Sequence, residues 1–407
     1  ATGSWPQRSG SRAAAAQQRF PKQPAAGNRT IGELALDIVP YLKLMVQKNG
    51  SDVFFSTGTQ VHLKTEGKTL PIAGSKMEKG HVRQLAYSIM TEDKIKEFES
   101  TMECNLAISI TGLGRFRVNV FKQRGDVAMV VRFIKGEIPA PEKLNLPAIL
   151  KDIIMLPRGL VLVVGSTGSG KSTSLASMIE HRNLNTTGHI LTIEDPIEFV
   201  YRHKKSVVDQ REVGLDTMSY QNALKNAMRE APDVILIGEI RDADTMSHAI
   251  AYAETGHLCL STLHANNANQ ALDRIVNFFP DTAHRQLYMD LSLNLKAIIS
   301  QRLVRGTDGQ RVPAVEVLLQ TSYISELIQK GEIHTIKEAM EQGTERGMQT
   351  FDQALYRLYK EGKIDLEEAL RNADSRNNLS LRIRLSESGQ VGGDADVGGF
   401  ALQDHDL

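Results

Sequence analysis

The sequence is poor in cysteine and carries no excess of either charge. Only two cysteines, Cys104 and Cys259, occur among 407 residues, and this number excludes a disulfide scaffold or a four-cysteine zinc module. Lysine and arginine total 48 and aspartate and glutamate total 48, so no global field attracts nucleic acid or membrane. No apolar run approaches the ~20 residues that a membrane-spanning helix requires. These absences predict a soluble cytoplasmic protein of two or three domains.

Both ends of the chain have the composition of unfolded segments. Residues 1–30 are basic, contain no acid before Glu33, and are rich in alanine, glutamine and proline. We expect a disordered leader or an expression-vector remnant there, because Ala13–Ala16 is too short for the apolar core of a signal peptide. Residues 373–407 end in a polar, Gly- and Asp-rich run, and we predict a disordered tail.

A small α+β domain is predicted for residues 31–137. Its beginning reads as a helix, an Asn49-Gly50 turn and a strand, and further short strands are separated by glycine turns. A helical pair at roughly 77–100 lies among them. Residues 138–147 are proline-rich and form the predicted linker.

A second domain, residues 148–372, alternates apolar strands with helical patterns. Four strongly apolar runs, 159–165, 189–195, 233–239 and 257–264, are separated by amphipathic helical segments. This alternation predicts an α/β domain with a parallel sheet covered on both faces. After residue 264 we expect helical segments up to about residue 372.

The first of these strands leads into a phosphate-binding loop. The segment 165–172, "GSTGSGKS", fits the pattern G-x4-G-K-[ST] between a strand and a helix. Backbone amides and the helix N-terminus would hold the phosphates of ATP, the lysine would reach the β- and γ-phosphates, and the serine hydroxyl would ligate Mg²⁺. The predicted nucleotide-binding residues are Gly165, Ser166, Thr167, Gly168, Ser169, Gly170, Lys171, Ser172 and Thr173.

Acidic residues end two of the other strands. Glu194 lies next to the end of the second apolar run, Glu198 follows shortly after it, and Glu239 ends the third run. Ligands of open α/β sheets lie beyond the carboxyl ends of the strands, so these acids should face the phosphate loop. Position 238 is glycine, where an aspartate is usual in such a strand end. Glu239 is therefore predicted to manage Mg²⁺ and to share water activation with Glu194 or Glu198.

Two histidines stand at the ends of the fourth run. His264 ends the run and is a candidate to contact the γ-phosphate, and His257 begins it. Each is also compatible with an ordinary hydrogen-bonded structural histidine. Their spacing of seven places them on opposite faces of an ideal strand, which argues against a shared metal.

Arginines are concentrated on strands of the first domain. Arg115 and Arg117 occupy alternate positions and share one face, and Arg132 lies on the next strand. A solvated basic face is one interpretation. The other is a set of arginine fingers presented to a nucleotide, in the same subunit or in a neighbouring one.

Together the four segments resemble the secretion and type IV pilus ATPase superfamily. "GSTGSGKS" is similar to its Walker A motif, "ILTIEDPIEF" to its Asp box, "APDVILIGEIRD" to its atypical Walker B segment and "ETGHLCLSTLHA" to its His box. The resemblance covers about residues 31–372. It implies a PAS-like N-terminal domain, a RecA-like ATPase domain and a homo-hexameric ring.

Within that superfamily the chain resembles the PilT/PilU-type retraction ATPases. Residues 323–331, "YISELIQKG", keep only the Leu327-Ile328 frame of a segment linked to retraction in PilT proteins, and this departure resembles the PilU branch. The resemblance implies ATP hydrolysis in pilus retraction and twitching motility at the inner face of the inner membrane. It also implies two partners, a PilT-like ATPase and an inner-membrane platform protein.

Two alternative functions remain open from the sequence. A RecA-type hexameric helicase would share the phosphate loop, but no concentrated basic stripe or aromatic stacking platform for a strand is present. A mainly regulatory subunit, beside another ATPase that does most of the pulling, is compatible with the altered 323–331 segment.

Overall fold

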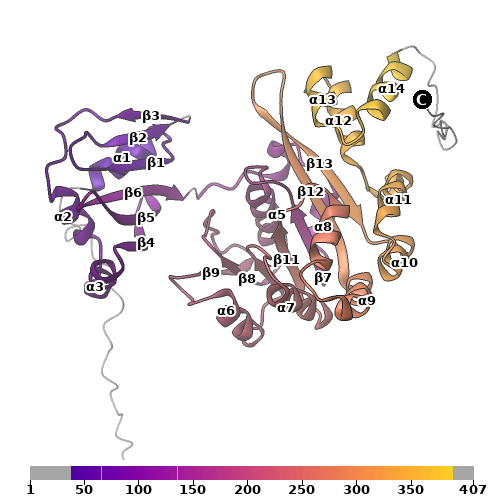
Figure 1. Cartoon of the computed structure of the whole chain (residues 1–407), viewed down its shortest axis with the longest axis horizontal. Helices are drawn as coiled ribbons and strands as arrows, with labels where there is room; N and C mark the ends of the chain where they lie inside the picture. The colour runs from indigo at the N-terminus through magenta and orange to yellow at the C-terminus, as the bar shows by residue number, and fades with distance from the viewer. Residues whose placement is uncertain (1–37, 66, 135, 388–407) are drawn as a thin grey trace, which may run out of the picture.

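The computed structural model describes residues 38–65, 67–134 and 136–387, which form a small and a large domain (Figure 1). The predicted leader, residues 1–30, lies outside the described residues. The small domain is an α+β unit, as predicted. Its elements are α1 (Val39–Gln47), β1 (Asp52–Phe55), β2 (His62–Thr65), β3 (Lys68–Pro71), α2 (His81–Ser88), α3 (Glu92–Thr101), β4 (Glu103–Ile110), β5 (Gly114–Gln123) and β6 (Asp126–Ile134).

A six-stranded antiparallel sheet with the order β3-β2-β1-β6-β5-β4 forms the small domain. One face buries alternating side chains such as Phe116 and Val118 against α1, α2 and α3. The other face carries the intervening residues, which include Arg115 and Arg117. Side-chain alternation along β5 therefore separates a hydrophobic core from an arginine-bearing surface.

The large domain holds the remaining elements. They are α4 (Ile149–Ile154), β7 (Gly159–Val164), α5 (Lys171–Asn185), β8 (Gly188–Glu194), β9 (Ser206–Glu212), α6 (Tyr220–Ala227), β10 (Val234–Ile237), α7 (Ala243–Glu254), β11 (Leu258–Leu263), α8 (Ala268–Val276), α9 (His284–Asn294), β12 (Leu295–Arg305), β13 (Arg311–Leu319), α10 (Ser322–Lys330), α11 (Ile336–Gln342), α12 (Phe351–Lys360), α13 (Leu366–Asn372) and α14 (Arg376–Glu387). Short 3-10 turns lie at Pro141–Leu144, Met228–Glu230, Asp281–Ala283, Ile333–Thr335 and Thr344–Arg346.

The large sheet is mixed, with the order β13-β12-β7-β11-β10-β8-β9. Six strands run parallel, and β13 is antiparallel to β12. The four predicted strands, β7, β8, β10 and β11, form its centre. Their carboxyl ends meet at one edge, which is where ligands of such sheets bind.

Helices cover both faces of this sheet, as the alternation of strands and helices predicted. Side chains of α4 and α5 pack with one set of strand residues, including Val161 and Val163. Side chains of α6 to α10 pack with the alternate set, including Leu160 and Leu162. Capping side chains start several of these helices, because Asp242, Asn267 and Thr350 each accept a backbone N–H in the first turn of α7, α8 and α12.

Two predictions for the carboxyl-terminal part of the chain are wrong. The segment after residue 264 is not wholly helical, because β12 and β13 form a long hairpin (Figure 1). The tail does not begin at residue 373, because α14 continues to Glu387 and buries Leu379 and Ile383 against a cluster with Phe351 and Leu355. Residues 388–407 lie outside the described part of the chain.

Both cysteines are core residues. Cys104 is 2% exposed and Cys259 is fully buried, and burial raises the pKa of both thiols. No helix within the described ranges is long and apolar enough to cross a membrane.

Candidate functional site

The phosphate loop joins β7 to α5, as predicted, and its glycines are required by its shape. Gly168 and Gly170 have φ of 79° and 88°, values that L side chains rarely adopt. At Gly165 a Cβ would clash with Ser169 Oγ and would lie 2.5 Å from the Gln301 carbonyl oxygen. The loop therefore presents its backbone closely packed at the N-terminus of α5, where anions are favoured.

Gln301 on β12 braces this loop, and the sequence did not reveal it. Its Nε2 donates to the Ser169 carbonyl oxygen at 2.8 Å, and its Oε1 accepts from Ser174 Oγ at 2.7 Å. The amide is 2% exposed, so both hydrogen bonds lie away from water. We expect helical segments after residue 264, whereas residues 295–305 form β12 beside β7, so no sequence signal pointed to Gln301.

Lys171 bends back onto the loop that it follows. Its Nζ donates to the carbonyl oxygens of Gly165 at 2.8 Å and of Ser166 at 3.0 Å. Burial lowers the pKa of Lys171, and the carboxylates of Glu239 and Glu198 oppose that effect. The ammonium is thus held between the loop and two of the predicted acids.

Glu239 lies two residues beyond β10 and is contacted by an arginine and a histidine. Arg241 donates to it from Nε at 2.9 Å and from Nη2 at 2.8 Å, and His264 Nε2 lies 3.1 Å from the other carboxylate oxygen. The side chain of Glu239 is 18% exposed, so it faces the site rather than bulk solvent. The structure therefore brings the predicted Glu239 and His264 together, and adds Arg241.

The glycine at 238 has a steric cause. A Cβ there would lie 2.7 Å from the Tyr220 hydroxyl and 3.2 Å from both Glu194 Cα and the Ile193 carbonyl oxygen. An aspartate at this position has no room. The departure from the usual strand ending is thus part of how β10 packs between β8 and α6.

Glu194 ends β8 in a buried position. Thr192 Oγ1 donates to its Oε1 at 2.7 Å and Gln210 Nε2 donates to the same oxygen at 3.2 Å. Burial raises the pKa of Glu194 to about 7 despite these bonds. Glu198 lies in the turn that follows, and its carboxylate acts to raise the pKa of Lys171.

These groups line one cavity of about 220 Å³. From the phosphate loop and α5 it is lined by Thr167, Gly168, Lys171 and Ser172, and from the strand ends by Glu194, Asp195, Glu198, Gly238, Glu239, Thr262 and His264. Ser166 opens instead onto a neighbouring hollow beside His264. Thr173 follows Ser172 in the first turn of α5.

The donor set of this cavity fits Mg²⁺ held together with a nucleotide. Magnesium in phosphate-transfer sites is bound by one or two protein oxygens and by the phosphates, and Ser172 and Glu239 both line the cavity. Among the described residues no group of three or more His, Cys, Asp or Glu side chains forms a ready-made metal site.

His257 does not join the site. It precedes β11, while His264 follows β11. The two histidines therefore lie at opposite ends of this strand, roughly 20 Å apart. His257 Nδ1 instead contacts the Thr255 hydroxyl at 3.1 Å and the Tyr252 carbonyl oxygen at 3.2 Å. This is the structural histidine of the two interpretations.

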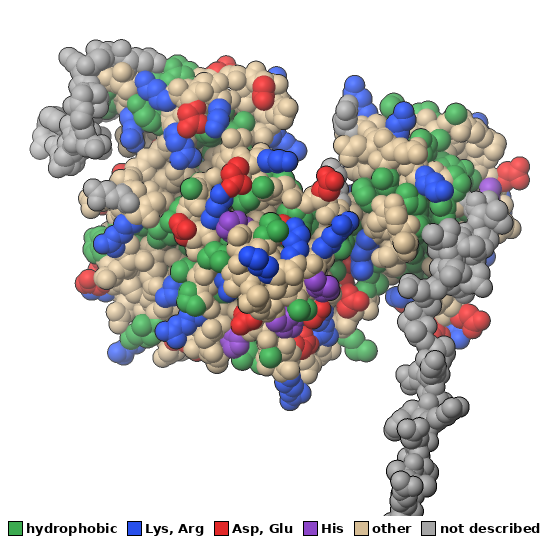
Figure 2. Space-filling model, turned by 180° about the vertical axis from the view of Figure 1, so that it is seen from behind, with side chains coloured by type: hydrophobic (Ala, Val, Ile, Leu, Met, Phe, Trp, Pro, Cys, Tyr) green, Lys and Arg blue, Asp and Glu red, His purple; other side chains and the backbone are tan. Residues whose placement is uncertain are grey.

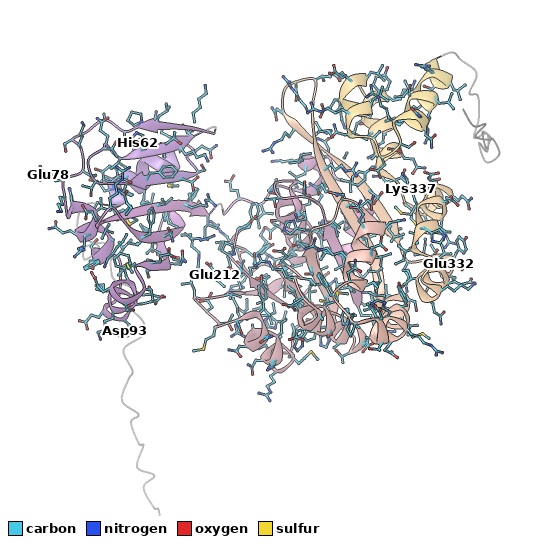
Figure 3. The ribbon with its side chains drawn as sticks, in the orientation of Figure 1. His62, Glu78, Asp93, Glu212, Glu332 and Lys337 are labelled. Carbon is cyan, nitrogen blue, oxygen red and sulfur yellow. The ribbon has the colours of Figure 1, made fainter. Side chains whose placement is uncertain are left out.

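The three predicted arginines lie on one face of the small domain. Arg132 stands opposite Arg117 in the β5–β6 ladder and pairs with Asp52 at 2.7 Å. Arg115 Nη2 lies 3.6 Å from the buried Glu212 carboxylate at the end of β9. Figure 3 shows Glu212 at the edge of the large domain that faces the small one. Arg117 has no ion pair among the described residues.

Charges of both signs are mixed on one face of the large domain. In Figure 2 acidic, basic and histidine side chains are interspersed on the rear face of the large domain, and a groove separates it from the small domain. The view shows no broad surface of one sign on that face. This mixed pattern agrees with the balanced composition.

Comparison with known proteins gives the family. Residues 32–379 match the family model described as type II/IV secretion system protein. The chain belongs to this family. The resemblance predicted from the four sequence motifs is confirmed, and it extends a few residues further at the carboxyl end.

Two curated relatives resemble nearly the whole chain. The type IV pilus ATPase PilU of Pseudomonas aeruginosa is 55% identical over 349 residues, which are 85% of this chain and 91% of PilU. The pilus retraction ATPase PilT of the same organism is 39% identical over 344 residues, 84% of this chain and 100% of PilT. The predicted resemblance to the PilU branch is therefore confirmed.

A solved structure shares the fold. The crystal structure of the pilus retraction motor PilT with bound ADP superposes with a TM-score of 0.80 at 40% identity, covering 85% of this chain and 100% of that one. The α/β architecture is thus that of a known nucleotide-binding motor.

Proposed function

We propose that this chain is an ATP-hydrolysing motor subunit of a type IV pilus machine that assists pilus retraction and twitching motility. One observation carries the proposal: the phosphate loop, the acids Glu194, Glu198 and Glu239, and His264 converge on one cavity. Homology to PilU and PilT, named pilus ATPases, supports the coupling to a pilus.

The residues of the cavity divide the chemistry among them. Lys171 exchanges its two loop carbonyl partners for phosphate oxygens, and its charge offsets the charge of the transferred phosphoryl group. Ser172 and Glu239 would hold Mg²⁺, which when bound neutralises phosphate charge. Arg241 and His264 fix the orientation of Glu239. We assign to Glu198 and Glu194, which line the same cavity, the tasks of orienting the attacking water and accepting its proton.

Replacing the loop lysine tests this function. Lys171→Ala should abolish ATP turnover, because backbone amides alone leave the transition-state charge uncompensated. Phosphate release by the purified full chain is the measurement, and Lys225→Ala, an exposed lysine on α6, is the matched control. Near-normal turnover by Lys171→Ala would remove the phosphate loop from the mechanism.

The assembly and its location are part of the same proposal. We infer a homo-hexamer in the cytoplasm at the inner face of the inner membrane, working with a PilT-like ATPase and a membrane platform protein. We also assign the small domain to the PAS-like class and the large one to the RecA-like class. The strand order of the small domain, with β1 in the middle of its sheet, supports the first assignment.

A mainly regulatory subunit is the second candidate. Residues 323–331 depart from the PilT segment that is linked to retraction. Most of them belong to α10, where Tyr323 is 53% exposed. The departure therefore changes an exposed surface of the chain. Complementation of a deletion strain with the Lys171→Ala chain separates the two functions. Restored twitching favours regulation, and lost twitching favours hydrolysis by this subunit.

A further inference from the structure

The turn between β11 and α8 carries His264. Hydrogen bonds from residues outside the nucleotide cavity hold this turn in place. His264 begins the turn and pairs with Glu239 at 3.1 Å. Ala268 begins α8 three residues beyond Ala265. Any shift of this short turn changes where the imidazole meets the Glu239 carboxylate.

A buried carboxylate on β13 anchors the helix end of the turn. Glu316 is 2% exposed, and its Oε1 accepts from the Ala268 N–H at 2.8 Å and from Ser300 Oγ at 3.0 Å. The charged groups around it are Arg302 and Asp374. Since the acceptor lies on β13, the edge strand that pairs with β12, it ties the start of α8 to the sheet.

Arg302 on β12 anchors the middle of the turn. Its Nη2 donates to the Asn266 carbonyl oxygen at 3.3 Å and pairs with Asp374 at 2.6 Å, while Nη1 donates to the Asn372 carbonyl oxygen at 2.8 Å. The guanidinium also lies 3.9 Å from the centre of the Phe351 ring. One side chain therefore joins the histidine turn to the C-terminal helices α12 and α13.

Neighbouring residues on β12 thus support both sides of the cavity. Gln301 braces the phosphate loop, Ser300 supports Glu316, and Arg302 holds the Asn266 carbonyl. We propose that Glu316 and Arg302 are positioning residues that fix His264 against Glu239 through the turn between β11 and α8. The inference rests on the proposed ATPase function.

A pair of substitutions at Glu316 separates its acceptor from its bulk. Glu316→Gln keeps a carbonyl oxygen for Ala268 and Ser300, whereas Glu316→Met keeps the volume and removes the acceptor. In steady-state ATP hydrolysis by the full chain, the methionine variant should lose on the order of tenfold in kcat, because small misplacements near a reacting centre are costly. Its KM for ATP should change less than about twofold, and the glutamine variant should retain kcat. Unchanged kcat in Glu316→Met would overturn the proposal.

A double-variant cycle tests whether Glu316 acts through His264. If it does, Glu316→Met should lower kcat no further once His264→Ala is present, because substitutions that act through the same group are not additive. Additive losses would overturn the proposal. The matched control is Thr321→Ala, which removes a side-chain acceptor from the first turn of α10 and should leave kcat unchanged.

Arg302 is tested in the same assay. Arg302→Lys keeps a charge for Asp374 but cannot reach both carbonyl oxygens, so kcat should fall with little change in the KM for ATP. Retention of full kcat by this variant would remove Arg302 from the proposal.

Amide exchange supplies a readout that does not depend on turnover. Exchange in residues 264–270 should be faster in Glu316→Met than in Glu316→Gln or wild type, since the Ala268 N–H loses its acceptor. Equal exchange in all three would overturn the positioning. If the wild-type chain shows no ATPase activity, the proposed function is refuted. Faster exchange in Glu316→Met than in wild type would still support the positioning in that case.

Discussion

At the scale of the residue, the site is made by carboxylates in three different environments. Glu239 is held by Arg241 and His264, and Glu194 is buried with a pKa of about 7. Glu198 shares the cavity with Lys171. The residue types and their order were evident from the sequence, because each acid ends or follows an apolar strand. The contacts of Tyr220 and Gln301 were not, because α6 and β12 come to the site from distant positions in the chain. Arg241 lies only two residues from Glu239, but the sequence does not show that its side chain turns back onto that carboxylate.

Glu239→Gln should bind ATP but hydrolyse it slower by on the order of a hundredfold or more, because the variant keeps the shape and loses the carboxylate charge. Fluorescent-nucleotide binding and phosphate release measure the two steps separately. Glu254→Gln, an exposed glutamate on α7, serves as the control. Simultaneous loss of binding and turnover would indicate a structural role for Glu239 instead.

Glu316 makes stability depend on pH. Burial raises its pKa from 4.5 to about 7, so the folded state keeps this proton at pH values where the unfolded state has lost it. Stability from this group is therefore greatest below about pH 4.5 and falls as the pH rises to about 7. Glu316→Gln should remove this contribution and gain roughly 1–3 kcal/mol over wild type at pH 8, relative to pH 5.

Denaturant unfolding at the two pH values measures that difference. Glu338→Gln, at an exposed position of α11, is the control and should show no such gain. A Glu316→Gln gain that is equal at both pH values would show that Glu316 does not titrate in this range.

At the scale of the element, the central strands were predictable and the edge strands were not. β7, β8, β10 and β11 are apolar runs buried on both faces, which is the strongest strand signal available. β9 has alternating exposed residues and β13 is antiparallel, so neither resembles the buried parallel type. β12 is buried but follows α9 without a break, and the expectation of helical segments after residue 264 does not include it. The hydrogen bonds from Gln301 to the phosphate loop and α5 could therefore not be predicted.

Gly238→Ala tests the packing at the end of β10. The added methyl would meet the Tyr220 hydroxyl at 2.7 Å, and overpacking of this kind typically costs about 1–3 kcal/mol. We expect lower stability and at least tenfold lower turnover, because Glu239 is the next residue. Adding Tyr220→Phe removes the clashing hydroxyl and should recover part of both. Tyr220→Phe alone is the control, and a Gly238→Ala chain equal to wild type would contradict the steric explanation.

At the scale of the whole molecule, the two domains meet through charge. Arg115 reaches the buried Glu212 of the large domain, while Arg132 is engaged by Asp52 within its own sheet. Arg117 has no ion pair among the described residues, and its charge acts on Glu212 less strongly than that of Arg115. We therefore propose Arg117 as the arginine that serves a nucleotide in another subunit. The sequence predicted the arginine face from side-chain alternation, but could not show which of its members were already paired.

Mixing two inactive chains tests that arrangement. Arg117→Ala and Lys171→Ala subunits should together recover part of the ATPase activity, because some interfaces then join an intact phosphate loop to an intact arginine. A finger supplied in trans contributes a rate factor of roughly 10³ or more. Specific activity should also rise with protein concentration as rings assemble. Rings that form without recovery would mean that the arginine acts in cis or only supports the fold, and full activity in a monomer would exclude the ring.

The burial of both cysteines makes the native chain suited to site-specific fluorescent labelling. With Cys104 and Cys259 in the core, a maleimide dye has no accessible native thiol to react with in the folded protein. Cysteines introduced at the exposed positions Thr69 and Lys225, one in each domain, would therefore take the dyes without a cysteine-free background. Energy transfer between them would then follow the separation of the two domains during nucleotide turnover.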